Sequence, residues 1–79
     1  MEKFFHQFVE WMNENRLLVL KVTFEKSGRK TIYGRLLQFD QKEKNLLVYV
    51  DDTKTIERFM FNQIDDIVPA KTSYVTNTL

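Results

Sequence analysis

The stretch Leu18-Val19-Leu20-Lys21-Val22-Thr23-Phe24 decides the fold, because apolar side chains occupy every second position in it. This alternation is the pattern of a β-strand with one buried face and one exposed face. The turn at residues 27–30 contains Gly28, so the strand is expected to lead into a hairpin. Residues 17–24 therefore predict the first strand of an antiparallel sheet.

Turn residues divide the rest of the chain into further strands of the same kind. Polar turns at residues 40–44 and 51–54 each separate two segments that alternate apolar and polar residues. A glycine within the second segment, Gly34, indicates sharp curvature. Four more strands are therefore expected, over residues 31–39, 46–50, 55–61 and 64–68, the last ending at Pro69, the only proline.

Before the first strand, the apolar residues have helical spacing. Phe4, Phe5, Phe8 and Met12 lie on one face of a helix expected over about residues 2–13. The segment 13–15 predicts its end, because Asn tolerates the left-handed conformation found there. The aromatic face is expected to pack on the sheet. The alternative is a helix on a membrane surface, which would normally carry more Lys and Arg.

The resulting fold class is mostly β, with an N-terminal helix followed by a five-stranded, strongly bent antiparallel sheet of the kind that builds small barrels. The chain has 79 residues, of which 43% are hydrophobic, so it supports one compact core. Residues 1–69 are expected to form this single domain. Residues 70–79 are polar and rich in Thr, and are expected to form a disordered tail.

Composition argues against an enzyme. The chain has no cysteine and a single histidine, His6, and no residue pattern accompanies that histidine. The acidic pairs at 51–52 and 65–66 are adjacent residues that point to opposite sides of an extended chain, so no metal site is expected. Neither a cofactor nor a small-molecule substrate is indicated, and no apolar run is long enough for a membrane span. A cytoplasmic protein is expected.

A basic hairpin is the first candidate functional surface. Lys26, Arg29, Lys30 and Arg35 are interleaved with Tyr33 around the turn that joins the first two strands. Such a cluster suits phosphate contacts with single-stranded RNA. The alternative is an ordinary solvated hairpin, since acidic residues lie nearby and the net charge is only +1.

The stretch Gly34-Arg35-Leu36-Leu37-Gln38-Phe39-Asp40, followed by Asn45-Leu46-Leu47, resembles the first signature of the Sm and Sm-like superfamily. The ending Ile64-Asp65-Asp66-Ile67-Val68-Pro69 is similar to the second signature of bacterial Sm-like RNA chaperones of the Hfq type. The resemblance implies an Sm-like small barrel, with Asp40 and Asn45 at base-reading positions. The chain is also similar to the YolD-like small proteins, which look like regulatory accessories to other proteins.

The resemblance favours a protein ligand over RNA. Where the RNA chaperones carry a Lys-His pair, this chain has Phe61-Asn62, and at the position of the aromatic base-stacker it has Lys42 or Glu43. The leading hypothesis is a non-enzymatic regulatory module that binds another protein, and the alternative is an Sm-like protein that binds single-stranded RNA. Sm-like barrels leave the fourth and fifth strands as edges, so homo-oligomers by strand-edge pairing are expected, with a possible protein interface at Phe59, Met60 and Phe61.

Overall fold

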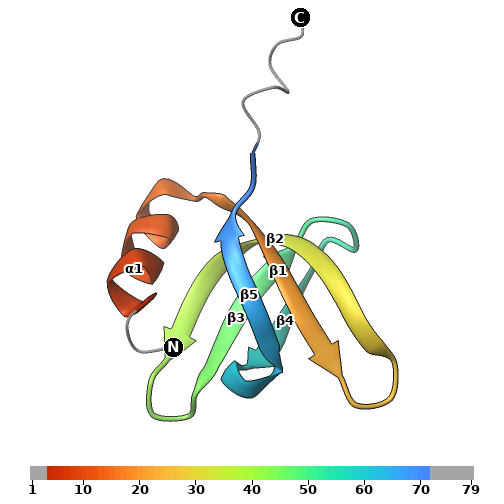
Figure 1. The fold of residues 1–79 in the computed structure, drawn as a ribbon. Coiled ribbons are helices and arrows are strands. Elements are labelled where there is room, and N and C mark those ends of the chain that lie inside the picture. The colour runs from red at the N-terminus through yellow and green to blue at the C-terminus, as the bar shows by residue number, and fades with distance from the viewer. Residues whose placement is uncertain (1–3, 72–79) are drawn as a thin grey trace, which may run out of the picture.

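The computed structural model describes residues 4–71, which form one α-helix and a five-stranded sheet (Figure 1). The predicted order of one helix followed by five antiparallel strands is confirmed. In chain order the elements are α1 (Phe5–Glu14), β1 (Leu17–Phe24), β2 (Gly28–Asp40), β3 (Asn45–Val50), β4 (Thr55–Met60), the short 3-10 helix η2 (Phe61–Gln63) and β5 (Ile64–Pro69).

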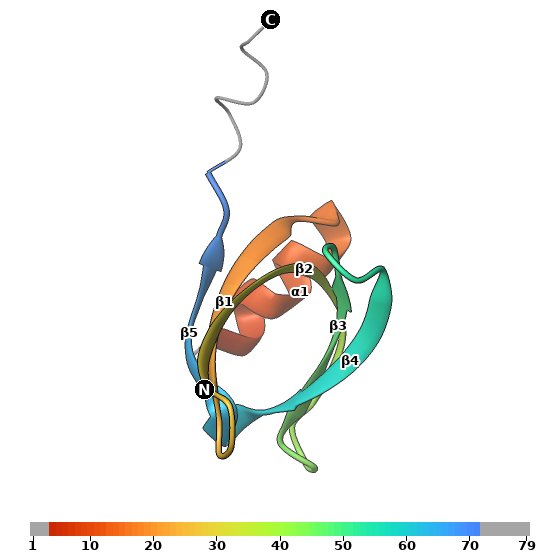
Figure 2. The ribbon, with the colours of Figure 1, turned by 90° about the vertical axis from the view of Figure 1, so that its right-hand side faces the viewer.

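The sheet has the strand order β4-β3-β2-β1-β5, and every neighbouring pair is antiparallel. It curves strongly, so that Figure 2 shows an arc with β4 and β5 on opposite sides. No strand pairing joins β4 to β5 within residues 4–71, so the sheet is open. The two outer strands therefore each have one side without a neighbouring strand.

Two features of β2 allow this curvature. At Gly34 the neighbouring strand comes so close that a β-carbon would meet the carbonyl oxygen of Tyr49 and would lie 2.7 Å from Cγ1 of Val48. Further along, the pairing of β2 with β3 shifts by one residue between Leu36 and Gln38, which is a β-bulge. Glycines and bulges both increase the bending of a strand. The position at which the sequence predicts sharp curvature, Gly34, is therefore also one where β2 approaches β3 too closely for a β-carbon.

The core lies on the concave side of the sheet. Alternate residues of each strand point into it, as the period of two in the sequence predicts. The residues buried there include Leu18, Leu20 and Val22 of β1, Leu36 of β2, Leu46, Val48 and Val50 of β3, Phe59 of β4 and Ile67 of β5.

Helix α1 adds an aromatic cluster to this core. Phe8 is fully buried, and its ring centroid lies 5.2 Å from that of Phe39 on β2. Phe5 stacks on the same ring at 5.2 Å and also contacts Phe61. Aromatic side chains bury large apolar areas in such contacts. The predicted packing of the helix against the sheet is therefore confirmed.

The C-terminal end of the helix matches its prediction. Asn15 adopts the left-handed conformation, with φ of 52°, and donates its N–H to the carbonyl oxygen of Met12. The N–H of Arg16 donates to the carbonyl oxygen of Trp11. These two carbonyl groups of the last helical turn therefore have backbone hydrogen-bond donors. The helix was expected to start at Glu2, which lies outside the described residues.

Several strand boundaries differ from those expected. β2 begins three residues earlier than the expected strand 31–39, because its pairing with β1 continues to Gly28 opposite Phe24. The fourth strand ends at Met60 because Phe61 begins η2. Ala70, which the sequence assigns to the tail, is buried and donates its N–H to the carbonyl oxygen of Leu17. The tail predicted beyond it lies, over residues 72–79, outside the part of the chain that the structure describes.

Candidate functional site

The basic hairpin does not bring its four cations together. Lys26 is exposed in the turn between β1 and β2, and Arg29 and Lys30 are exposed at the start of β2. Lys30 lies over the ring of Phe24, with Nζ 5.8 Å from the ring centroid. Arg35 follows Arg29 by six positions along β2, which is roughly 20 Å in an extended strand. The hairpin therefore holds three of the predicted cations, and Arg35 belongs to another region.

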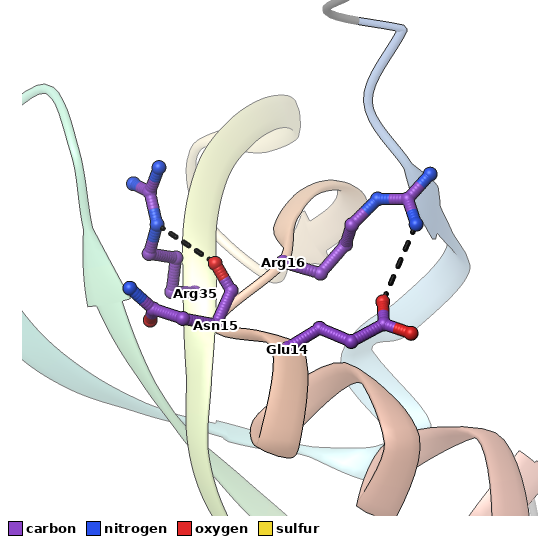
Figure 3. A network of polar contacts seen from close by, with 4 residues as sticks. All are labelled: Glu14, Asn15, Arg16 and Arg35. Atoms are coloured by element: carbon purple, nitrogen blue, oxygen red, sulfur yellow. Dashed lines mark hydrogen bonds and ion pairs between the residues drawn. The ribbon is translucent and has the colours of Figure 1, made fainter.

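Arg35 connects three segments of the chain. Its Nη1 lies 3.0 Å from Oδ1 of Asp51, and its Nε donates to the carbonyl oxygen of Asn15 at 3.2 Å. Figure 3 shows the second contact beside the ion pair between Arg16 and Glu14. Because the guanidinium is paired with a carboxylate, it offers little charge to a phosphate. Arg35 holds the end of α1 near β2 and the turn before β4.

Asp40 and Asn45 do lie together, as a directly opposed pair across the turn between β2 and β3. One carboxylate oxygen of Asp40 accepts the backbone N–H groups of Lys42 and Glu43, each at 2.9 Å, which is an Asx-type turn. Both residues line an open groove of about 420 Å³ together with Gln38, Glu43, Leu47, Arg58 and Met60. This groove is the polar candidate site.

The residues expected at a protein interface are divided between the core and the surface. Phe59 is 1% exposed, so its side chain cannot reach a partner. Phe61 packs against Phe5, with ring centroids 6.0 Å apart. Of the three, Met60 presents its side chain to solvent, with 40% exposed.

Sequence reasoning missed two neighbours of Met60 on the same face of β4. Ile56 is 61% exposed, and Arg58 is exposed between Ile56 and Met60. The alternation that places Phe59 inside puts these residues outside, so the period of two held the signal. Together they make the outer surface of an edge strand.

The backbone of β4 also points donors outward. Phe61 donates its N–H to the carbonyl oxygen of Lys44 at 2.9 Å, across to the β3 side. Donor directions alternate along an antiparallel strand, so Ile56, Arg58 and Met60 turn their N–H groups away from β3. Met60 agrees with this, because its N–H is donated to Oε1 of Gln63 at 2.8 Å. Ile56 and Arg58 therefore present unpaired backbone groups at the edge.

An apolar row crosses the convex face of the sheet. Val68, Val19 and Tyr33 are directly opposed on β5, β1 and β2. Val68 is 43% exposed and Tyr33 is 44% exposed. On β3 and β4, Tyr49 is opposite the exposed Ile56. Large apolar side chains are thus exposed on β2, β4 and β5, with the half-buried Val19 and Tyr49 on β1 and β3 between them.

Within residues 4–71, no group of three or more His, Cys, Asp or Glu side chains is placed to hold a metal ion, and no helix is long and apolar enough to cross a membrane. His6 is exposed on α1. The groove and the β4 edge are the candidate functional surfaces of the described residues.

Comparisons of the chain with protein-family models, with curated proteins and with solved structures return no match.

Proposed function

We propose that this chain is a non-enzymatic binding module of the Sm-like small-barrel type that acts in the cytoplasm by contacting another protein. The fourth and fifth strands are edges, as the resemblance to Sm-like proteins implies. The observation that carries the proposal is the β4 edge, where Ile56 is 61% exposed beside two outward-facing backbone donors. An exposed edge of this kind is a template for main-chain pairing with a second polypeptide.

The convex face supports the same function. An antiparallel sheet usually presents polar side chains on its solvated face. Here Tyr33, Ile56 and Val68 reach the surface on three different strands. The half-buried Val19 and Tyr49 lie between them on β1 and β3, and apolar surface that extends over neighbouring strands is typical of sites that another protein covers.

Site-specific photo-crosslinking in the cells that make the chain tests this function. A photoreactive amino acid at Ile56 is expected to form a crosslink to a protein. The matched control carries the same amino acid at Val9, which is 45% exposed on α1 and lies away from the β4 edge, and no crosslink is expected there. Crosslinks from Ile56 to RNA, or equal protein crosslinks from both positions, would overturn the proposal.

Single-stranded RNA is the second candidate, and the groove favours it. Asp40 and Asn45, which the Sm resemblance marks as base-reading positions, share this groove with Arg58. A guanidinium beside hydrogen-bonding side chains is suited to a nucleotide. A gel shift against a mixed pool of single-stranded RNA separates the two functions, and the protein-binding proposal predicts no shift at physiological salt.

A further inference from the structure

In the described part of the chain, the regular part of the β5 edge lacks free N–H donors for an added strand. Ala70 donates its N–H to the carbonyl oxygen of Leu17, so the alternation of donors turns Ile67 and Pro69 away from β1. The N–H of Ile67 is already donated to Oδ1 of Asp66 at 3.0 Å, and proline has no N–H. After the bulge at Asp65, β5 therefore offers an incoming strand no free donor.

The β4 edge is open over a short length. Ile56 and Arg58 point their N–H and C=O groups outward, and no strand lies on that side of β4 in the described part of the chain. At the C-terminal end of β4, the side-chain oxygen of Gln63 accepts the N–H of Met60. A strand that adds to the sheet therefore pairs with the middle of β4.

A second copy of the chain is poorly suited to this edge. Two β4 strands related by a two-fold axis pair antiparallel, so the axis passes through the middle of the paired segment. An axis at Glu57 places Glu57 opposite Glu57, and an axis at Arg58 places Arg58 opposite Arg58. An axis at Ile56 places Arg58 opposite Lys54. Like charges directly opposite each other destabilise a strand pair. The homo-oligomer expected from the sequence stays a prediction. In the described residues, however, the regular part of β5 has no free N–H donor, and symmetric pairing through β4 places like charges opposite each other.

We propose that β4 accepts an antiparallel strand from a different protein, and that this strand carries an acidic residue opposite Arg58, a basic residue opposite Glu57 and a β-branched residue opposite Ile56. The inference rests on the proposed function and names the partner of the same edge. In the partner's own chain direction, the segment reads acidic, basic, β-branched. Opposite charges at directly paired positions stabilise the added strand, and the β-branched residue covers exposed Ile56.

The charges on β4 are free for this pairing. No ion pair within residues 4–71 involves Glu57 or Arg58, and Glu57 accepts one hydrogen bond, from Oγ1 of Thr55 at 3.2 Å. Asp40 and Glu43 line the same groove as Arg58, but they lie on the side of Arg58 that faces β3. The added strand would approach Arg58 from the opposite side.

A tethered strand tests the proposal. The full chain is extended at its C-terminus by a flexible Gly–Ser linker of about 30 residues, which spans roughly 30 Å, followed by Thr-Glu-Lys-Val-Thr. The matched control ends in Thr-Lys-Glu-Val-Thr, which has the same composition with the two charges exchanged. Tethering raises the effective strand concentration to about the millimolar range. Backbone hydrogen exchange, followed by NMR, reports pairing at each amide.

The amides of Ile56 and Arg58 are expected to exchange roughly tenfold more slowly with the first segment than with the control, since two attractive pairs become two repulsive ones. In a host with Glu57→Lys and Arg58→Glu, this preference is expected to reverse. Both substituted residues are exposed, and a thermal melt confirms that the host folds.

Equal slowing by both segments would overturn the proposed charge pattern while leaving strand addition at β4. Slowing at Ile67 instead would overturn the choice of edge. If neither segment slows any amide, the proposed strand partner is wrong, and the crosslink from Ile56 decides separately whether the protein-binding function stands.

Discussion

The carbonyl oxygen of Tyr49 lies in the space into which a β-carbon on Gly34 would project. The obstruction is backbone, so it cannot be relieved by rotating a side chain, and Val48 closes the same space from a second direction. The close approach of β2 to β3 therefore requires glycine at this position.

Gly34→Ala is expected to lower the free energy of unfolding by at least about 2 kcal/mol, because two strands must move apart to accept the methyl group. The matched control is Gly28→Asn at the turn, where φ is +77° and nothing lies within 4 Å of a β-carbon. Asn tolerates this conformation, so a loss of less than about 1 kcal/mol is expected. Urea unfolding of both variants provides the measurement, and equal losses would contradict the steric explanation.

Phe8→Ala is expected to cost about 3 kcal/mol, because the fully buried ring contacts the rings of Phe5, Trp11 and Phe39. Val9→Ala on the exposed side of α1 is the control, with an expected change of under about 0.5 kcal/mol. Thermal melts compare the two. A Phe8→Ala protein as stable as the parent would show that α1 does not depend on the core for its position.

The ion pair between Arg35 and Asp51 can be measured by a double-mutant cycle with Arg35→Gln and Asp51→Asn. Both side chains are about one-third exposed, so the expected coupling is about 0.5–1 kcal/mol and should fall as salt is added. Arg35→Gln alone is expected to destabilise more than Asp51→Asn, since Arg35 also bonds the carbonyl oxygen of Asn15. If both single substitutions lowered the free energy of unfolding equally and the coupling energy were zero, Arg35 would not have the structural role assigned to it.

Local pattern was sufficient to predict the helix and the five strands, but not the short 3-10 helix η2. The alternation around Leu20 predicted β1, the spacing of the Phe residues predicted the packed face of α1, and Asn15 ends the helix in the expected conformation. These features depend on neighbours along the chain. The contact of Arg35 with Asp51 could not be predicted in this way, because it joins residues 16 positions apart through the bend of β2.

The direction of edge donors also lay beyond the sequence pattern. Periodicity places side chains on faces, but the pairing that turns Ile56 outward and caps Met60 with Gln63 depends on which neighbour each strand meets. Phe59 is a different case, because the alternation along β4 already places its side chain on the core face, although the sequence indicated it as a possible interface residue. The predicted basic cluster was wrong for Arg35, because six positions along an extended strand separate it from Arg29 by roughly 20 Å.

Gln63→Ala tests whether the side chain of Gln63 limits pairing at β4. The substitution frees the N–H of Met60 and lengthens the open edge. The amide of Met60 is therefore expected to exchange severalfold faster with solvent than in the parent, because it loses its hydrogen-bond acceptor. Backbone hydrogen exchange followed by NMR provides this measurement. Light scattering over a concentration series tests separately whether the parent forms the homo-oligomer expected from the sequence or has the mass of one 9.6 kDa chain. Asn62→Ala, at the exposed neighbouring residue, is the control, and equally fast exchange of the Met60 amide in that protein would contradict the capping role.

The last prediction separates a protein ligand from RNA. If RNA were bound, neutralising Arg29 and Lys30 would weaken binding about equally for all sequences and flatten the salt dependence by about one unit of slope per lost phosphate contact. Asn45→Ala would instead relax base preference, because Asn45 lines the groove. The hairpin holds three cations and Arg35 is paired with Asp51, so we expect no affinity for single-stranded RNA tighter than about micromolar at physiological salt. Under the protein-binding function, Ile56→Lys is the damaging change, because the apolar surface of β4 becomes charged where a partner would cover it. A salt-titrated measurement that gives nanomolar affinity for a defined single strand, with base preference relaxed in Asn45→Ala and binding kept in Ile56→Lys, would establish the groove as the site in place of the β4 edge.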